Sequence, residues 1–131
     1  MLASNSLKQA EAFLSAAGII SAAAEAELLM CHCLEISRGE LATQLVLDTN
    51  LKAPSGFFDL VELRCTRVPL QHITGKAPFR SIELSVGEGV FIPRPETEQV
   101  VQVAIDFLSL LPGEPLALDI GTGSGAIAIS I

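Results

Sequence analysis

Near the end of the chain, three alternating glycines follow a short apolar segment. Residues 119–125 read DIGTGSG, and the small or apolar residues 126–131 come next. This order predicts a buried strand at Leu116–Ile120, a glycine-rich turn and the start of a helix. Glycine suits such a turn because a Cβ disfavours its backbone angles and would keep a ligand from the main chain. The free amides at the helix start favour an anionic group, either a pyrophosphate or a carboxylate.

Two cofactor classes fit this loop. The run GTGSGA satisfies the relaxed dinucleotide pattern G-x-G-x-x-A, which by itself is a weak signal. Asp119 would repel a pyrophosphate, but its carboxylate could pair with the ammonium group of a bound amino acid. S-adenosylmethionine carries such an ammonium group. We therefore expect S-adenosylmethionine, ahead of a nicotinamide dinucleotide and of a glycine turn that binds nothing.

The elements upstream begin with residues 1–67, which predict a small all-helical bundle. Apolar spacing and caps indicate a helix over 6–17, a second after Ser21, a third opened by the capping box Ser37-x-x-Glu40 and ending near Leu47, and a fourth capped by Ser55 and ending near Arg67. Residues 48–54 between the last two helices are expected to form a loop.

The second half of the chain differs in composition. Residues 68–94 are rich in glycine and proline and predict a linker containing a β-hairpin, with strands at Ile82–Val86 and Val90–Ile92 around Gly87-Glu88-Gly89. Residues 95–131 form the third predicted part, in which a helix opens at Pro95 and ends near Pro112 before the strand and the glycine loop.

Composition narrows the classes of function. The chain has 131 residues, of which 50% are hydrophobic, and a net charge of −7. Such a chain folds, and its acidic balance argues against direct binding of nucleic acid. Its apolar runs are far shorter than the ~20 residues of a membrane span, and its start resembles no targeting signal. We expect a cytoplasmic, monomeric protein.

The cysteines indicate no metal site. Three is an odd number, and Cys31-His32-Cys33 lies within a predicted helix, where residues two apart point in nearly opposite directions. We expect buried structural cysteines, with no metal ligand in the chain.

Three stretches carry a resemblance to a known family: PLQHITG at 69–75, FIPRPETE at 91–98 and LDIGTGSGAIA at 118–128. Together they resemble the protein-(glutamine-N5) methyltransferases of the HemK/PrmC type, which modify peptide chain release factors. The resemblance implies a small all-α N-terminal bundle, a β-hairpin linker and then the start of an α/β Rossmann-like methyltransferase domain. His72 departs from the pattern, since the family more often has tyrosine there.

The same resemblance implies a site for S-adenosylmethionine. Its cofactor-binding residues would be Asp119, Gly121, Thr122, Gly123, Ser124 and Gly125. A wall of the same cavity, or its support, would come from Phe91, Pro93, Arg94, Glu96 and Thr97. For Arg94 an equally good interpretation is a surface ion pair with Glu96 or Glu98, and for Phe91 a contact in the hairpin core.

The family reaction transfers a methyl group to the amide nitrogen of the glutamine in a Gly-Gly-Gln motif, positioned by an Asn-Pro-Pro-Tyr loop. That loop is expected after Ile131, so we expect no catalytic residue among these 131. The chain is then the first part of such an enzyme, and by itself it should neither bind S-adenosylmethionine tightly nor methylate. The helical domain would recognise the release factor or stabilise the enzyme.

Two other interpretations stay open. One is a truncated, non-catalytic protein whose helical domain binds a partner. The other is a methyltransferase acting on a nucleic-acid amine, against which the net charge of −7 counts.

Overall fold

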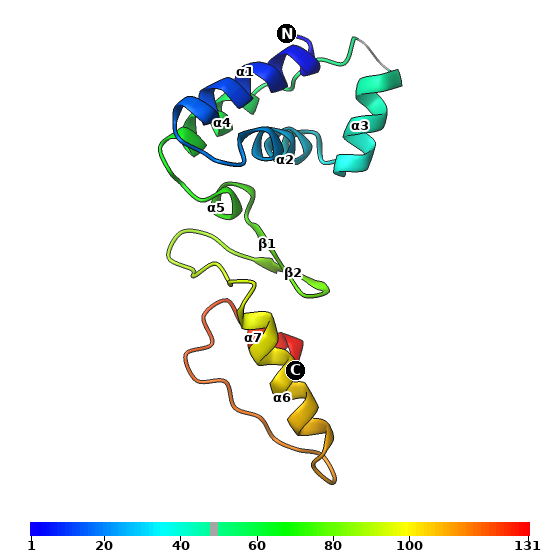
Figure 1. Ribbon diagram of the computed structural model, residues 1–131, viewed down its shortest axis with the longest axis vertical. Helices are drawn as coiled ribbons and strands as arrows, with labels where there is room; N and C mark the ends of the chain where they lie inside the picture. The colour runs from blue at the N-terminus through cyan, green and yellow to red at the C-terminus, as the bar shows by residue number, and fades with distance from the viewer. Residues whose placement is uncertain (48–49) are drawn as a thin grey trace. The chain divides into compact units, whose positions relative to one another are not determined.

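The computed structural model describes residues 1–47 and 50–131, and these divide into two compact units, Met1–Thr74 and Gly75–Ile131. The first unit contains α1 (Ala3–Ala16), α2 (Ala22–Leu34), α3 (Arg38–Leu47), α4 (Phe57–Cys65) and α5 (Leu70–Thr74). The second contains β1 (Lys76–Phe79), β2 (Ile82–Ser85), α6 (Thr97–Ser109) and α7 (Ala126–Ser130) (Figure 1). No helix in these described ranges has the length and apolar character needed to cross a membrane.

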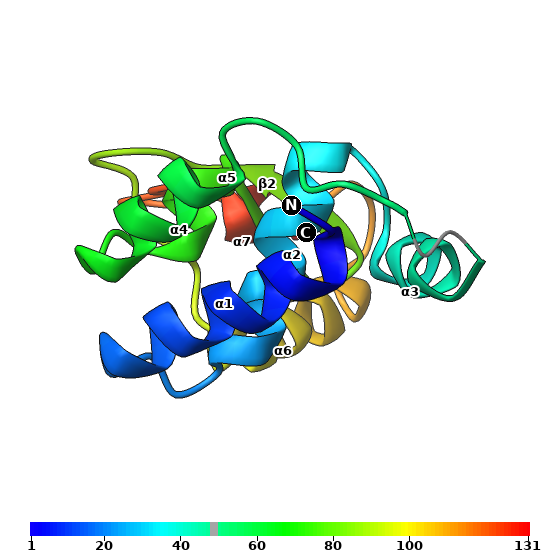
Figure 2. The ribbon, with the colours of Figure 1, turned by 90° about the horizontal axis from the view of Figure 1, so that it is seen from above.

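The first unit is a helical bundle, as the sequence predicts. Its helices α1, α2 and α4 pack around one apolar core, while α3 stands at the edge of the bundle in both views (Figures 1 and 2). Helical spacing places the buried positions of α1 on one stripe, because residues three or four apart share a face. The buried apolar residues of this core are Ala3, Ala10, Leu14, Ile19, Ala22, Ala26, Leu29, Met30, Cys31, Leu41, Phe57 and Val61.

Of the three predicted caps, one is confirmed in full, one in position only, and one is wrong. The capping box at α3 is confirmed: the Ser37 N–H donates to Glu40 Oε2 at 2.8 Å, and the Glu40 N–H donates to Ser37 Oγ at 3.2 Å. Ser21 is the N-cap residue of α2, but its side chain makes no capping hydrogen bond. The prediction for Ser55 is wrong, since the N-cap of α4 is Gly56, whose φ of 88° turns the chain into the helix.

Long-range contacts explain two further differences in the helical unit. Helix α1 begins at Ala3 rather than at residue 6, because the Ala3 N–H donates to the Leu51 carbonyl at 2.7 Å. The short helix α5 lies inside the predicted linker. Pro69 precedes this helix, and the Pro69 carbonyl accepts from the N–H groups of His72 and Ile73. The predicted loop over 48–54 falls partly outside the described residues, at positions 48 and 49.

The linker contains a hairpin, and one of its two strands is confirmed: β2 lies within the predicted strand Ile82–Val86. Strand β1 pairs antiparallel with β2 in the register Lys76↔Ser85 to Phe79↔Ile82, so the turn lies at Arg80 and Ser81. The prediction that paired Ile82–Val86 with Val90–Ile92 is wrong. Pro78 disfavours a strand at 76–79, but a two-stranded sheet leaves one edge of each strand unpaired, where a missing N–H costs little.

The predicted buried strand at Leu116–Ile120 is also wrong in this structure. The segment has no regular structure, and Leu116, Leu118 and Ile120 are 96%, 84% and 87% exposed. A strand forms only beside another strand that satisfies its backbone, and no described segment pairs with this one. Helix α6 begins at Thr97, with Glu96 as its N-cap residue, two residues after the predicted start at Pro95.

Candidate functional site

The glycine loop has the backbone that its sequence predicts. Gly121, Gly123 and Gly125 all adopt left-handed conformations, with φ of 75°, 57° and 79°. The loop closes through a hydrogen bond of 2.9 Å from the Gly125 N–H to the Thr122 carbonyl, and α7 starts at the next residue. A Cβ at Gly125 would approach Ile129 Cδ1 to 3.2 Å. The turn therefore depends on glycine both for its angles and for its packing.

Asp119 supplies an unused acceptor just before this loop. Its Oδ2 atom is buried and has no hydrogen-bond partner among the described residues. A buried carboxylate oxygen without a donor is unfavourable, so the arrangement fits a ligand that brings an N–H group. The ammonium of an amino acid is such a donor. The loop thus offers one carboxylate acceptor next to a main chain that carries few side chains.

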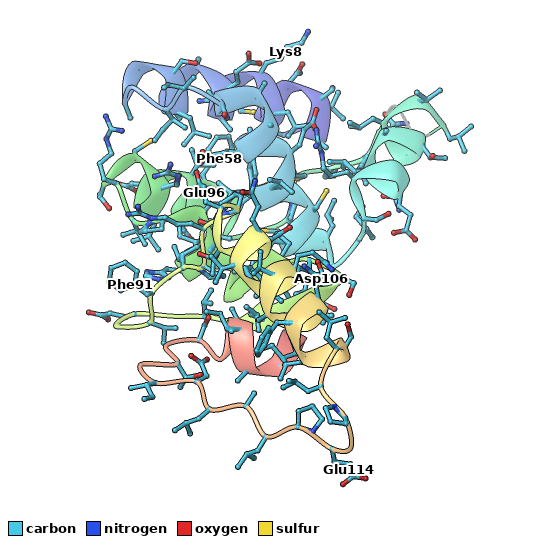
Figure 3. All side chains as sticks on the ribbon, turned by 60° about the horizontal axis from the view of Figure 1, so that its bottom comes forward. Lys8, Phe58, Phe91, Glu96, Asp106 and Glu114 are labelled. Atoms are coloured by element: carbon cyan, nitrogen blue, oxygen red, sulfur yellow. The ribbon has the colours of Figure 1, made fainter. Side chains whose placement is uncertain are left out.

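The five predicted wall residues lie on the irregular segment between the hairpin and α6. Phe91 is 80% exposed, and its ring points away from the ribbon (Figure 3). Pro93 and Thr97 are half-buried, whereas Arg94 and Glu96 are exposed. In the described part of the chain Arg94 forms no ion pair with Glu96 or Glu98; its carbonyl accepts from the Thr97 N–H at 3.0 Å. The side chains of Phe91, Arg94 and Glu96 are therefore exposed, whereas those of Pro93 and Thr97 are partly covered.

One small core anchors both the wall segment and the helix after the glycine loop. Its buried residues come from the hairpin, the residue that follows it, α6 and α7: Ala77, Phe79, Leu84, Val86, Val101 and Ala126. Val90 and Ile92, which flank Phe91, pack partly buried against this core, and so does Ile127. The structure thereby ties two segments about 30 residues apart in sequence to the same apolar cluster.

Sequence reasoning missed the polar network at the hairpin turn. The Arg80 N–H donates to Glu98 Oε1 at 2.9 Å, and its guanidinium donates to the Glu98 carbonyl at 3.2 Å and to Gln102 Oε1 at 2.8 Å. Gln102 Nε2 then donates to Asp106 Oδ1 at 2.8 Å, further along α6. The signal in the sequence was the i, i+4 spacing of Glu98, Gln102 and Asp106 on one helix face.

The sulfur and imidazole groups lie in the helical unit. Cys31 is buried, as predicted, and burial, with the nearby Glu27 charge, raises the pKa of its thiol. Burial also raises the pKa of the half-buried Cys33. His32 is exposed on α2. Across residues 1–47 and 50–131, no three or more His, Cys, Asp or Glu side chains gather as a metal site would require.

A shallow hollow lies at the start of α3. Its lining residues are Ser37, Gly39, Glu40, Thr43 and Gln44. The Glu40 carboxylate accepts from the backbone N–H and the hydroxyl of Ser37, and these hydrogen bonds lower the pKa of Glu40. The Glu40 carboxylate thus stands at the edge of this hollow.

Comparison with known proteins gives consistent matches over most of the chain. Residues 5–75 match the family profile described as the PrmC N-terminal domain. A release factor glutamine methyltransferase of Mycolicibacterium smegmatis is 42% identical over 125 residues, which are 95% of this chain and 43% of that protein. The namesake from Streptomyces coelicolor is 47% identical over 124 residues, 94% of this chain and 43% of that protein. The protein from Bifidobacterium longum is 38% identical over 135 residues, covering all of this chain and 46% of its own length. The chain thus spans less than half the length of these curated relatives.

Proposed function

The chain belongs to the PrmC/HemK family of release factor glutamine methyltransferases, and we propose that it forms the N-terminal part of an enzyme that methylates a glutamine side chain of a release factor. The methyl donor is S-adenosylmethionine, and the acceptor is the amide nitrogen of the glutamine in a Gly-Gly-Gln motif. The observation that carries this proposal is the left-handed glycine loop next to the unpartnered, buried Asp119 Oδ2.

The loop and Asp119 bind the methionine end of the donor. The Asp119 carboxylate accepts a hydrogen bond from its ammonium group, which satisfies the buried oxygen. Gly121, Gly123 and Gly125 leave the main chain open to direct contact, while Thr122 and Ser124 contribute hydroxyl groups. S-adenosylmethionine, when bound, supplies a methyl group made electrophilic by its sulfonium centre.

The wall segment closes the cavity and limits the access of water. Phe91 offers an exposed aromatic ring that can cover an apolar part of the ligand. Pro93, Arg94, Glu96 and Thr97 line or support the same cavity at the start of α6. The glutamine amide nitrogen is a weak nucleophile because its lone pair is delocalised into the carbonyl. The rate of transfer therefore depends mainly on how this nitrogen is oriented toward the methyl group. The residues that orient it are expected beyond Ile131, in an Asn-Pro-Pro-Tyr loop.

Residues 95–131 begin an α/β Rossmann-like domain in the intact enzyme. Exposed Leu116, Leu118 and Ile120 support this proposal, because a buried parallel strand has just such apolar residues on its faces. The helical unit, Met1–Thr74, recognises the release factor, and the hairpin that follows it is part of the linker to the methyltransferase domain. A role in binding a basic partner is supported by the acidic balance of the chain. Acting on a release factor places the enzyme in the cytoplasm.

Titration calorimetry of the intact enzyme tests the cofactor site. S-adenosylmethionine should bind the wild type, and Asp119→Asn should weaken binding by about tenfold or more, the usual effect of losing a charged hydrogen bond. The matched control is Glu114→Gln, an exposed acid on the preceding loop (Figure 3), which should leave binding unchanged.

Failure of the wild type to bind S-adenosylmethionine, or binding of NAD in its place, would overturn the proposed function. A second assay measures transfer of labelled methyl to a release factor and to a version with the Gly-Gly-Gln glutamine replaced by glutamate. Labelling of both proteins would show that another atom is the acceptor.

A further inference from the structure

The turn of the hairpin is attached to the first turn of α6 by one arginine. Arg80 uses its backbone N–H and both terminal nitrogens of its guanidinium, and these reach the Glu98 carboxylate, the Glu98 carbonyl and the Gln102 amide. Three hydrogen bonds from one residue fix both the distance and the rotation of the helix relative to the turn, because a planar guanidinium allows little freedom.

Arg80 is an unexpected residue for the position that it occupies. Its φ is 51°, in the left-handed region where glycine or asparagine is more comfortable. Glycine or asparagine would adopt this backbone conformation with less strain. The arginine is therefore explained by its side-chain contacts with α6 rather than by the geometry of the turn.

The segment between the hairpin and α6 has little else to hold it. Residues 91–96 form no helix or strand, and their backbone bonds are local, such as those from Glu98 N–H to the Pro95 carbonyl and from Gln99 N–H to the Glu96 carbonyl. Val90 and Ile92 fix its beginning in the small core. The Arg80–Glu98 contacts fix its end, immediately after Thr97.

We propose that Arg80 and Glu98 are positioning residues for the cofactor site: they hold the wall segment 91–97 in the arrangement that binds S-adenosylmethionine. This inference rests on the proposed function and adds two residues to it. Neither residue needs to touch the ligand. They act through Phe91, Pro93, Arg94, Glu96 and Thr97, whose places depend on where α6 starts.

Steady-state kinetics of the intact enzyme with a release factor substrate tests this proposal. Arg80→Gly removes the guanidinium, keeps the N–H that reaches Glu98 and relieves the left-handed backbone. Glu98→Ala removes the acceptor for that N–H. Each variant should raise the KM for S-adenosylmethionine by about five- to tenfold, with kcat changed less than about twofold, because a misplaced wall weakens binding of the donor.

Two further variants separate positioning from simple stabilisation. Glu98→Gln retains an oxygen that can accept from the Arg80 N–H, so it should restore the KM to within about twofold of the wild type. Glu83→Ala breaks the exposed Lys76–Glu83 ion pair on the same hairpin and should leave the KM unchanged. Thermal unfolding of all four variants accompanies the kinetics.

The possible outcomes are distinct. If Arg80→Gly and Glu98→Ala lower the unfolding temperature but keep the wild-type KM, the contacts are only structural and the inference is wrong. If Glu83→Ala raises the KM as much as they do, the hairpin as a whole is responsible and the inference is again wrong. If the wild type binds no S-adenosylmethionine, the proposed function fails and this inference fails with it.

Discussion

The two units of the chain differ in how completely they bury their apolar side chains. In Met1–Thr74, large residues such as Phe57, Leu14 and Leu29 are fully buried among helices from the same unit. In Gly75–Ile131, Phe79 and Val101 are buried, but Leu116, Leu118 and Ile120 are open to solvent. The first unit buries the apolar stripes of its packed helices, although Ile20, Val46 and Leu47 are exposed, whereas the second leaves a whole alternating apolar segment in solvent.

This contrast shows how far a local pattern determines structure. An amphipathic helix satisfies its own backbone, so α1 and α2 bury their apolar stripes by packing against each other and the other helices of the unit. A strand needs neighbours for its backbone as well as for its side chains. The hairpin has them, because β1 and β2 are joined by a short turn, whereas the segment 116–120 has none in the described chain.

The largest difference between the units should appear in amide hydrogen exchange. In the 131-residue chain, core amides of α1 and α2 should exchange about a thousandfold or more slowly than unstructured amides, since they open only by unfolding. Amides of Leu116–Ile120 should exchange at nearly unprotected rates, because they are unpaired. Exchange followed by mass spectrometry measures both. Slow exchange at 116–120 in this chain would contradict the contrast, and slow exchange only in the intact enzyme would sharpen it.

A matched pair of leucines gives the next largest effect. Leu29→Ala, at 0% exposure, should lower the free energy of unfolding by about 2–5 kcal/mol through lost burial and a cavity. Leu116→Ala should change it by less than about 0.5 kcal/mol, because the side chain is already in solvent. Chemical denaturation monitored by circular dichroism compares them. Equal effects would mean that the segment 116–120 is packed in solution.

Ser6 allows a smaller test in the opposite direction. It is completely buried in the helical core, and its Oγ has no hydrogen-bond partner among the described residues. Ser6→Ala should therefore stabilise the helical unit by about 1 kcal/mol, because an unsatisfied hydroxyl is removed and alanine is the better helix former. Ser4→Ala, on the exposed side of α1, is the matched control for helix propensity alone. Destabilisation by Ser6→Ala would show that the hydroxyl has a partner in solution.

The smallest expected effect concerns the α3 capping box. Ser37→Ala should cost about 1 kcal/mol or less at neutral pH, while Ser55→Ala, where no cap exists, should have no effect. The hydrogen bonds from Ser37 lower the pKa of Glu40 in the folded state. Their contribution is therefore complete above the pKa of an unfolded glutamate and is lost as the pH falls through the lowered value. When helicity is followed by circular dichroism as the pH is lowered, Glu40→Gln should lack this acid-dependent step. The same pH dependence in Glu40→Gln as in the wild type would show that the step does not come from Glu40.

Local signals were sufficient for some features and insufficient for others. The box Ser37-x-x-Glu40 was predicted because a cap involves residues three apart, and the left-handed glycine loop because glycine alone adopts such angles freely. The strand β1 was missed because Pro78 disfavours strands except at an open edge, which only the sheet topology reveals. Helix α5 was hidden among prolines and glycines, and Leu70 and Ile73 pack partly buried against the helical core.

The same division holds for the candidate site. The types and order of Asp119, Gly121, Gly123 and Gly125 already indicated a cofactor loop, since the required chemistry lies in neighbouring residues. That Asp119 Oδ2 is buried without a partner could be seen only in the folded chain. Arg80 was invisible as well, because its contacts join positions about 20 residues apart.

The sequence by itself determined that the first unit is helical, that the glycine turn forms and which family the chain belongs to, since each depends on short-range pattern. Tertiary structure decided which strand pairs with β2, where α6 begins relative to the hairpin, and which apolar segments are buried. The physical reason is that hydrogen bonds within a helix or turn join residues a few positions apart, whereas strand pairing and burial depend on distant partners.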